Sequence, residues 1–418
     1  MHPKDNQATT WKFVLDLAEE LNKKNIPYTF EAEAALFVHA IGNTDPGNAA
    51  AADPSQVPNA LSLRQVSVSI QWDQFDAAYE LFRPYVSEPV HKTSEAVQFA
   101  FQRDGYTVQI TGYYNTVIVT DPHRTPVTLE GQIVWCKSLE FLKWHFRADR
   151  LYLDKIQQLL ASKQRRLNQV NARSWTQDAY QAWVNRFGIP AVAAEQIQSN
   201  PVGRIKSLER FLHDVSGAKV ANLLGSHGGK AVALALLGAD VTIVDLSPEN
   251  ARYATELANA AGVNVRYVVS DVLSLPASEL TSDYDLVLME LGILHYFVDL
   301  NPLAEQIAKL LRKGGKLVLQ DFHPVSTKLI SSKGSKHKVT GNYFRSSVEE
   351  TRVAFTKFVG DEETREQTTV QLRKWTLGEI VTAMASTGLF IRVLDEEPNH
   401  KKDDIGIPKT FTLVAEKL

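Results

Sequence analysis

The sequence has little of three features that often define a protein class: cysteine, long apolar runs and an excess of one charge. Its 418 residues include a single cysteine, Cys136, which excludes an intramolecular disulfide and a cysteine-rich metal site. No run approaches the roughly 20 apolar residues that a membrane-spanning helix needs. Residues 1–7 are polar and contain no apolar signal core. We therefore expect a cytoplasmic protein with no membrane partner.

The charges nearly balance, with 45 Lys and Arg against 48 Asp and Glu, which gives a net charge of −3. This balance argues against nucleic acid as a partner, because polyanion binders carry a basic excess. Hydrophobic residues at 44% and charged residues at 22% are ordinary for a globular protein. The length predicts two or three domains, at roughly 100–200 residues each.

A helical pattern over residues 150–170 separates two unlike halves. Its apolar positions recur at helical spacing, and it runs into a polar, basic stretch at 163–166. The pattern predicts a helix that closes one domain and leads into a connector; a helix inside one larger domain is the alternative. We divide the chain into a first domain at 1–155, a connecting helix and linker at 156–172, and a second domain at 173–418.

The first half mixes helices and strands, which predicts an α+β domain. The predicted helices are 9–24, 32–41 and about 74–83, and the predicted strands are 64–70, 106–111, 115–119 and 127–135. Segment 43–60 is rich in Ala, Pro, Asn and Asp and predicts a long surface loop.

The second half alternates apolar, β-rich runs with helical segments. The predicted strands are 219–224, 240–244, 264–269, 284–289 and 315–320. This alternation predicts a doubly wound α/β fold, with helices on both faces of a parallel sheet. Runs at 389–396 and 410–416 follow a predicted helix near 376–387 and predict an antiparallel pair at the sheet edge.

The turn after the first of these strands carries the main functional signal. Its small residues, Gly225-Ser226-His227-Gly228-Gly229, let the backbone approach a ligand closely, and the next helix begins with unpaired N–H groups. Asp245 ends the second strand, twenty residues beyond Gly225. An acid at that place can accept hydrogen bonds from both ribose hydroxyls of a nucleoside cofactor.

The second half resembles the class I S-adenosylmethionine-dependent methyltransferases over about residues 173–418. The segments that carry the resemblance, in the family's order, are 220–228, 238–249, 270–272, 284–287, 292–297 and 311–317. The resemblance implies a Rossmann-like, seven-stranded sheet, S-adenosylmethionine as the cofactor and no metal.

The same resemblance implies a cofactor site. Its residues are Asn222, Leu224, Gly225, Ser226, Gly228, Asp245, Leu246, Ser270, Asp271, Val272, Glu290 and, from a lid helix, Tyr180. Three positions depart from the family: Asn222 replaces a frequent acid, and Leu224 and Ser226 replace usual glycines. Core packing of the cluster at 175–183 is the alternative to a lid. A nicotinamide dehydrogenase fits less well, because Gly-x-Gly-x-x-Gly is absent.

Three side chains after the fourth and fifth strands are candidate bases: Glu290, His295 and His323. Methyl transfer from a sulfonium needs alignment above all, and it needs a base only where the acceptor starts protonated. Each candidate has a structural alternative: packing for His295, a position away from the substrate for His323, and a helix cap for Glu290.

We expect a small-molecule acceptor methylated on oxygen, nitrogen or carbon. The Asn/Asp-Pro-Pro-aromatic turn typical of nucleobase amino methylation is absent at 289–292. Methylation of cytosine at C5 needs a cysteine nucleophile, and Cys136 lies in the other domain. A non-catalytic nucleoside-binding sensor or scaffold is the alternative, followed by an RNA methyltransferase. The lysine-containing insert at 325–345 either attracts an acidic substrate or forms a solvated loop.

The segments 31–41, 66–70, 104–110 and 150–154 follow one another in an order similar to that of the small nucleotidyltransferases, which residues 12–155 thus resemble. That chemistry needs paired carboxylates and a third on a neighbouring strand to hold Mg²⁺. The corresponding positions are Ser67, Ser69 and Gln109. The resemblance implies a catalytically inactive domain that serves binding or homodimerisation; an unassigned α+β domain is the alternative.

Overall fold

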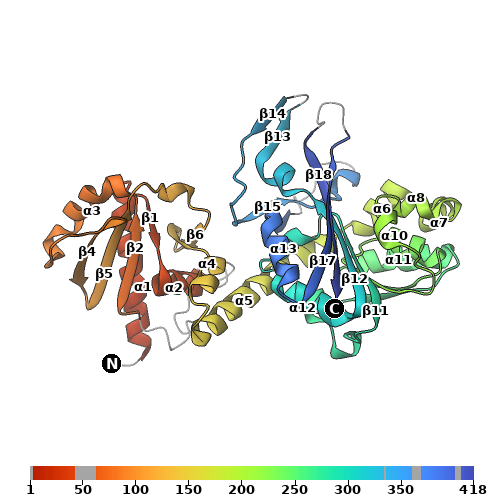
Figure 1. The fold of residues 1–418 in the computed structure, drawn as a ribbon, viewed down its shortest axis with the longest axis horizontal. Helices are drawn as coiled ribbons and strands as arrows, with labels where there is room; N and C mark the ends of the chain where they lie inside the picture. Colours follow the sequence, from red (N-terminus) through yellow and green to blue (C-terminus); the bar gives the residue numbers. More distant parts are fainter. Residues whose placement is uncertain (1–2, 43–62, 334–335, 360–368, 401–405) are drawn as a thin grey trace. The chain divides into compact units, whose positions relative to one another are not determined.

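The chain folds as two compact units in a computed structural model that describes residues 3–42, 63–333, 336–359, 369–400 and 406–418 (Figure 1). The first unit extends to Lys163 and includes residues 344–347, and the second holds residues 164–343 and 348–418. The division falls within helix α5 (Arg150–Trp175), inside the predicted connecting segment. The predicted loop at 43–60 lies outside the described residues.

The first unit contains a mixed, seven-stranded sheet in the order β3-β4-β5-β2-β1-β7-β6. Its strands are β1 (Tyr28–Phe30), β2 (Gln65–Ile70), β3 (His91–Lys92), β4 (Ala96–Arg103), β5 (Tyr106–Tyr113), β6 (Arg124–Leu129) and β7 (Gln132–Lys137). Its helices are α1 (Pro3–Lys23), α2 (Ala32–Gly42), α3 (Phe75–Phe82) and α4 (Leu139–His145), besides the start of α5. Apolar side chains of strands and helices form one buried core.

Two predicted strands of this unit are wrong. Segment 115–119 runs into the short 3-10 turn η5 (Ile118–Thr120). Val117 and Val119 are 53% and 55% exposed, so these two apolar side chains do not pack in the core as strand residues would. Segment 127–135 is split between β6 and β7 by a tight turn, in which Glu130 and Gly131 both have positive φ. The sequence pattern ran through this turn because apolar residues flank it on both sides.

The second unit is built on a seven-stranded sheet in the order β10-β9-β8-β11-β12-β18-β17. Its strands are β8 (Lys219–Leu223), β9 (Asp240–Asp245), β10 (Val265–Val269), β11 (Tyr284–Glu290), β12 (Leu311–Phe322), β17 (Leu389–Pro398) and β18 (Pro408–Lys417). The first five strands run parallel, and β18 pairs antiparallel with both β12 and β17. This confirms the predicted doubly wound, Rossmann-like fold and its antiparallel edge.

Helices cover both faces of this sheet (Figure 1). One face packs on α6 (Ala179–Phe187), α7 (Pro190–Ser199), α8 (Pro201–Ile205), α9 (Glu209–Leu212), α10 (Gly229–Leu236) and α11 (Pro248–Ala260). The other face packs on α12 (Asn301–Leu310) and α13 (Leu377–Ala385). Successive residues of a strand point to opposite faces, so Val220 lies in one core and Ala221 in the other.

The segment between β12 and α13 forms two small hairpins. The π-type turn η9 (Val325–Leu329) leads into β13 (Ile330–Lys333) and β14 (Lys336–Val339), and β15 (Val348–Arg352) pairs with β16 (Thr369–Arg373) around the turn η10 (Thr356–Phe358). Lys333, Lys336 and Lys338 are exposed, as a solvated insert would have them. Lys328 is buried instead, and its Nζ donates a hydrogen bond to the carbonyl of Lys374.

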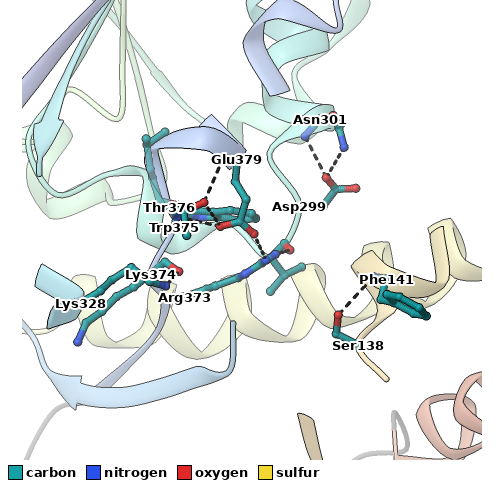
Figure 2. A network of polar contacts seen from close by, with 12 residues as sticks. Ser138, Phe141, Asp299, Asn301, Lys328, Arg373, Lys374, Trp375, Thr376 and Glu379 are labelled. Carbon is teal, nitrogen blue, oxygen red and sulfur yellow. Dashed lines mark hydrogen bonds and ion pairs between the residues drawn. The ribbon is translucent and has the colours of Figure 1, made fainter. Parts of the chain in front are cut away.

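A buried arginine fastens the end of β16 to the loop that follows β11 (Figure 2). Arg373 is 1% exposed, lies over the Trp375 ring and donates hydrogen bonds to the Val298 carbonyl at 2.5 Å and to Glu379 at 2.9 Å. Trp375 Nε1 donates to the Leu294 carbonyl at 2.9 Å. Thr376 caps α13 and, together with Glu379, forms a capping box.

This network predicts the stability of two variants. Arg373→Met removes the buried cation that pairs with Glu379, and it leaves the Val298 carbonyl without its donor. We therefore expect the free energy of unfolding to fall by about 3 kcal/mol. Arg392→Met is the matched control, because Arg392 pairs with Glu416 at the surface; it should cost less than about 1 kcal/mol. Urea unfolding followed by circular dichroism measures both, and equal losses would contradict the assignment.

Candidate functional site

A pocket of about 570 Å³ opens where the parallel strands of the second unit end. The carboxyl ends of parallel strands meet at one edge of a sheet, so residues that follow different strands converge there. Predicted site residues in the lining are Leu224, Gly225, Ser226, Asp245, Leu246, Ser270, Asp271, Val272, Glu290 and His295.

The turn between β8 and α10 forms the floor of the pocket. Leu224 and Ser226 have left-handed φ angles of 51° and 49°. A Cβ on Gly225 would lie 2.5 Å from Asn222 Oδ1 and 2.9 Å from a methyl group of Ile243, so no side chain fits there. Asn222 itself is buried beneath the turn and donates to the Leu288 carbonyl. The structure therefore places Asn222 outside the lining, as a support for the turn.

Asp245 joins this turn to the end of β9. Its carboxylate accepts hydrogen bonds from the backbone N–H of Ser226 at 3.1 Å, from that of Ser247 at 2.9 Å and from Asn250 Nδ2 at 3.2 Å. Burial raises the pKa of Asp245, while these three donors act in the opposite direction. The carboxylate is thus held in one orientation at the pocket wall.

A second carboxylate, Asp271, follows β10. Its oxygens accept hydrogen bonds from Asn168 Nδ2 at 2.7 Å and from the Leu273 backbone N–H at 2.9 Å. Asn168 lies on the C-terminal part of α5, and it lines the pocket together with Asn171 of the same helix. Sequence reasoning did not select these two asparagines, because they lie in a segment that it assigned to a connector.

Glu290, the last residue of β11, forms an ion pair with Lys230 in the first turn of α10. Both side chains line the pocket. Lys230 directly follows the Gly-Gly pair of the turn, and that position is the only sequence signal that could have identified it.

The loop after β11 is held by a carboxylate that sequence reasoning also missed. Asp321, near the end of β12, is buried and accepts the backbone N–H groups of Gly292 at 2.6 Å, Ile293 at 3.3 Å and Leu294 at 3.1 Å. This loop carries His295 into the lining, where burial lowers the pKa of the imidazole and Asp321 opposes that effect. His295 is therefore neutral near pH 7 and able to accept a proton.

Besides Asn222, three predicted site residues lie outside the lining, namely Tyr180, His323 and Gly228. The Tyr180 hydroxyl donates to Glu256, and its ring lies under Arg252, so it is not placed over the pocket; Trp175 and Trp183 of the same cluster line the pocket instead.

His323 is 3% exposed, with Nε2 against Glu396 at 2.6 Å and Nδ1 accepting from the Val325 N–H. Both nitrogens of this ring are thus occupied by protein partners.

Gly228 packs against α11, where a Cβ would lie 2.7 Å from Ala254.

Basic and aromatic residues form a further wall, and of these residues only His227 lies in a motif that the sequence indicated. They are Arg186, Phe187, Arg204, His227, Lys357 and Phe358. They come from α6, α8, the Gly-rich turn and η10, and no fixed spacing connects them.

The part of the chain that the structure describes has no helix long and apolar enough to cross a bilayer. Among the same residues, no group of three or more His, Cys, Asp or Glu side chains could hold a metal ion.

A family model described as a methyltransferase domain matches residues 224–319, which include the pocket floor, Asp245, Asp271 and Glu290. This segment is similar in sequence to methyltransferase domains. The match confirms the predicted fold and enzyme class for the segment, and S-adenosylmethionine is the cofactor that this class uses.

Curated relatives match about a quarter of the chain. A ubiquinone biosynthesis O-methyltransferase of Xanthomonas oryzae is 35% identical over 110 residues, which are 26% of this chain and 45% of that protein. An uncharacterised protein of Mycobacterium tuberculosis is 30% identical over 108 residues, which are 26% of this chain and 38% of that protein. The chain thus spans less than half the length of these relatives.

Solved structures resemble the second unit at low identity. An S-adenosylmethionine-dependent methyltransferase from Mesorhizobium loti is 18% identical, with a TM-score of 0.40, covering 50% of this chain and 96% of that one. Magnesium protoporphyrin IX methyltransferase from Synechocystis, with bound SAH, is 14% identical, with a TM-score of 0.39, covering 60% and 99%. Because both TM-scores are below 0.5, the fold assignment rests on the strand order itself.

The geometry of Asp245 predicts the effect of its removal on cofactor binding. Asp245→Ala should weaken S-adenosylhomocysteine at least about tenfold, because it removes an acceptor for ribose hydroxyls and frees the Ser226 N–H. Asp240→Ala, at the exposed start of the same strand, should leave the affinity unchanged. Isothermal titration compares the two, with circular dichroism as the check on folding. Equal affinities would place the cofactor elsewhere.

Proposed function

We propose that the second unit transfers a methyl group from S-adenosylmethionine to a small-molecule acceptor, by in-line displacement. The observation that carries the proposal is the coincidence of the methyltransferase match at 224–319 with the pocket at the ends of β8 to β11. The O-methyltransferase relatives support a small acceptor, although they match only a quarter of the chain. The cytoplasmic location expected from the sequence belongs to the same proposal.

The residues present fit this cofactor. Asp245 would hold the ribose hydroxyls, and Asp271 and Val272 the adenine, because carboxylates and a backbone N–H complement those groups. Leu224, Gly225, Ser226 and Leu246 would line its apolar and backbone contacts. When bound, S-adenosylmethionine supplies an activated methyl group, so the protein needs to orient the acceptor and exclude water.

The pocket offers two candidates for taking a proton from the acceptor. His295 is neutral and lies in the lining, so we propose it as the base. Glu290 is paired with Lys230 and would orient the acceptor or the cofactor. His323 is outside the lining and bonded to Glu396, and we assign it a structural role at the ends of β12 and β17.

The nucleotidyltransferase resemblance would place Ser67, Ser69 and Gln109 where that chemistry needs carboxylates, and these three side chains are neutral. Ser67 of β2 pairs in register with Gln109 of β5. The Gln109 side chain accepts a hydrogen bond from Gln65 and donates one to Gln98. A chain of amides cannot hold Mg²⁺ against phosphates as carboxylates do. We propose that this unit is catalytically inactive and serves binding or homodimerisation, which sedimentation of the full chain at several concentrations would test.

The activity is tested with labelled cofactor. The purified full chain is incubated with methyl-labelled S-adenosylmethionine and a deproteinised metabolite extract, and binding of S-adenosylhomocysteine is measured in parallel. Label in a small molecule supports the proposal. Tight binding without any labelled product favours a sensor or scaffold, label in added RNA favours an RNA methyltransferase, and the absence of binding contradicts all three.

The assignment of the base predicts a difference between two histidine variants. With the acceptor found by labelling, His295→Gln should lower kcat about 100-fold, because proton removal is lost, without changing S-adenosylhomocysteine affinity. His323→Gln should leave kcat near that of the wild type. Because burial lowers the pKa of His295, kcat/KM should fall with acid only below about pH 6.5, where the ring gains its proton. A wild-type rate in His295→Gln would remove it as the base.

A further inference from the structure

The further wall of the pocket, formed by basic and aromatic residues, holds three cations that lack carboxylate partners among the described residues. They are Arg186 of α6, Arg204 of α8 and Lys357 of η10. None of them belongs to an ion pair within the described part of the chain. Side-chain carboxylates normally neutralise arginines that line a pocket, so the absence of one here leaves their charge available to a ligand.

Aromatic rings hold these arginines in place. The Arg186 guanidinium lies between Phe187 and Phe358, at 4.7 Å and 4.6 Å from the ring centroids, and Arg204 lies 5.0 Å from Phe187. Stacking fixes a guanidinium while leaving its N–H groups free to donate. The Nε of Arg204 is buried and has no hydrogen-bond partner among the described residues, which is costly unless a ligand accepts from it.

The charges of the lining also show an excess of positive charge. Among the described residues, the lining holds five cationic side chains, Arg186, Arg204, Lys230, Arg352 and Lys357, against three carboxylates, Asp245, Asp271 and Glu290. Burial and the charge of Arg186 lower the pKa of Arg204, and burial and the charge of Arg204 lower that of Lys230. A sulfonium cofactor would add further positive charge, so the charges of the described lining residues would still favour an anionic ligand beside it.

We propose that the acceptor of this methyltransferase carries a carboxylate or phosphate group, which Arg186, Arg204 and Lys357 bind. This inference rests on the proposed function and names the substrate class of the same pocket. The cofactor's own carboxylate is the other source of an anion, but it is a single group and the cofactor's amino group offsets it. Phe187 and Phe358 would contact the apolar body of the acceptor beside its acid group.

The first arm of the test asks whether the arginines serve the cofactor. Arg186→Gln and Arg204→Gln are compared with Arg252→Gln, an arginine that also lies over an aromatic ring, Tyr180, but outside the pocket lining. Calorimetry measures S-adenosylhomocysteine and 5′-methylthioadenosine, which lacks the methionine carboxylate. We expect both affinities to be unchanged in all three variants. A loss for S-adenosylhomocysteine alone would assign the arginines to the cofactor and overturn the proposal.

The second arm measures the anion directly, with inorganic pyrophosphate as the probe and potassium chloride of equal ionic strength as the reference. We expect the wild type and Arg252→Gln to bind pyrophosphate at least about tenfold more tightly than Arg186→Gln and Arg204→Gln. Equal binding by all four proteins would overturn the proposal. This arm is run with and without S-adenosylhomocysteine, so it remains informative if the proposed methyl transfer fails.

The third arm uses the labelled products from the metabolite extract, separated by anion exchange. We expect the label in compounds that the exchanger retains, and less of it with the arginine variants. Label confined to uncharged compounds would overturn the proposal and leave the methyltransferase function intact.

Discussion

The carboxylate of Asp321 is the constraint on which the acceptor side of the pocket depends. It gathers three successive backbone N–H groups of the loop after β11, a loop that begins with left-handed Leu291 and Gly292. Arg373, the last residue of β16, and Trp375, two residues beyond it, donate hydrogen bonds to two carbonyls of the same loop. Because donors and acceptors of the loop are satisfied from two different elements, its backbone is fixed and His295 is presented at one place.

The sequence predicted most of the second unit because its strands are short, apolar and regularly alternated with helices. The residues that follow those strands, Asp245, Asp271 and Glu290, line the pocket for the same topological reason. Asp321 and Lys230 were missed, since a single acid or lysine has no periodic signal and gains its meaning from a partner distant in sequence. Tyr180 and His323 show the reverse: their sequence neighbours suggested the pocket, but Glu256 and Glu396 hold them elsewhere.

Charge illustrates how a whole-chain quantity can mislead about a site. The net charge of −3 argues against a polyanion spread over the surface, yet the described residues of the pocket lining include more cations than carboxylates. The low polarity of a pocket strengthens the attraction between such cations and an anion, compared with the same attraction in water. A nearly neutral chain can therefore bind an acidic small molecule, because the excess of positive charge is confined to one wall of the pocket.

Helix α5 shows why the domain boundary was hard to place. Gln164, Asn168 and Asn171 recur at spacings of four and three, so they share one helix face, which a sequence pattern suggests is solvated. In the structure Gln164 donates to the Tyr296 carbonyl and accepts from the Val298 N–H, while Asn171 exchanges two hydrogen bonds with Gln371. This polar face satisfies the backbone of the loop after β11 and of β16. The C-terminal half of α5 therefore belongs to the second unit, and a domain cut at residue 173 would remove part of its pocket wall.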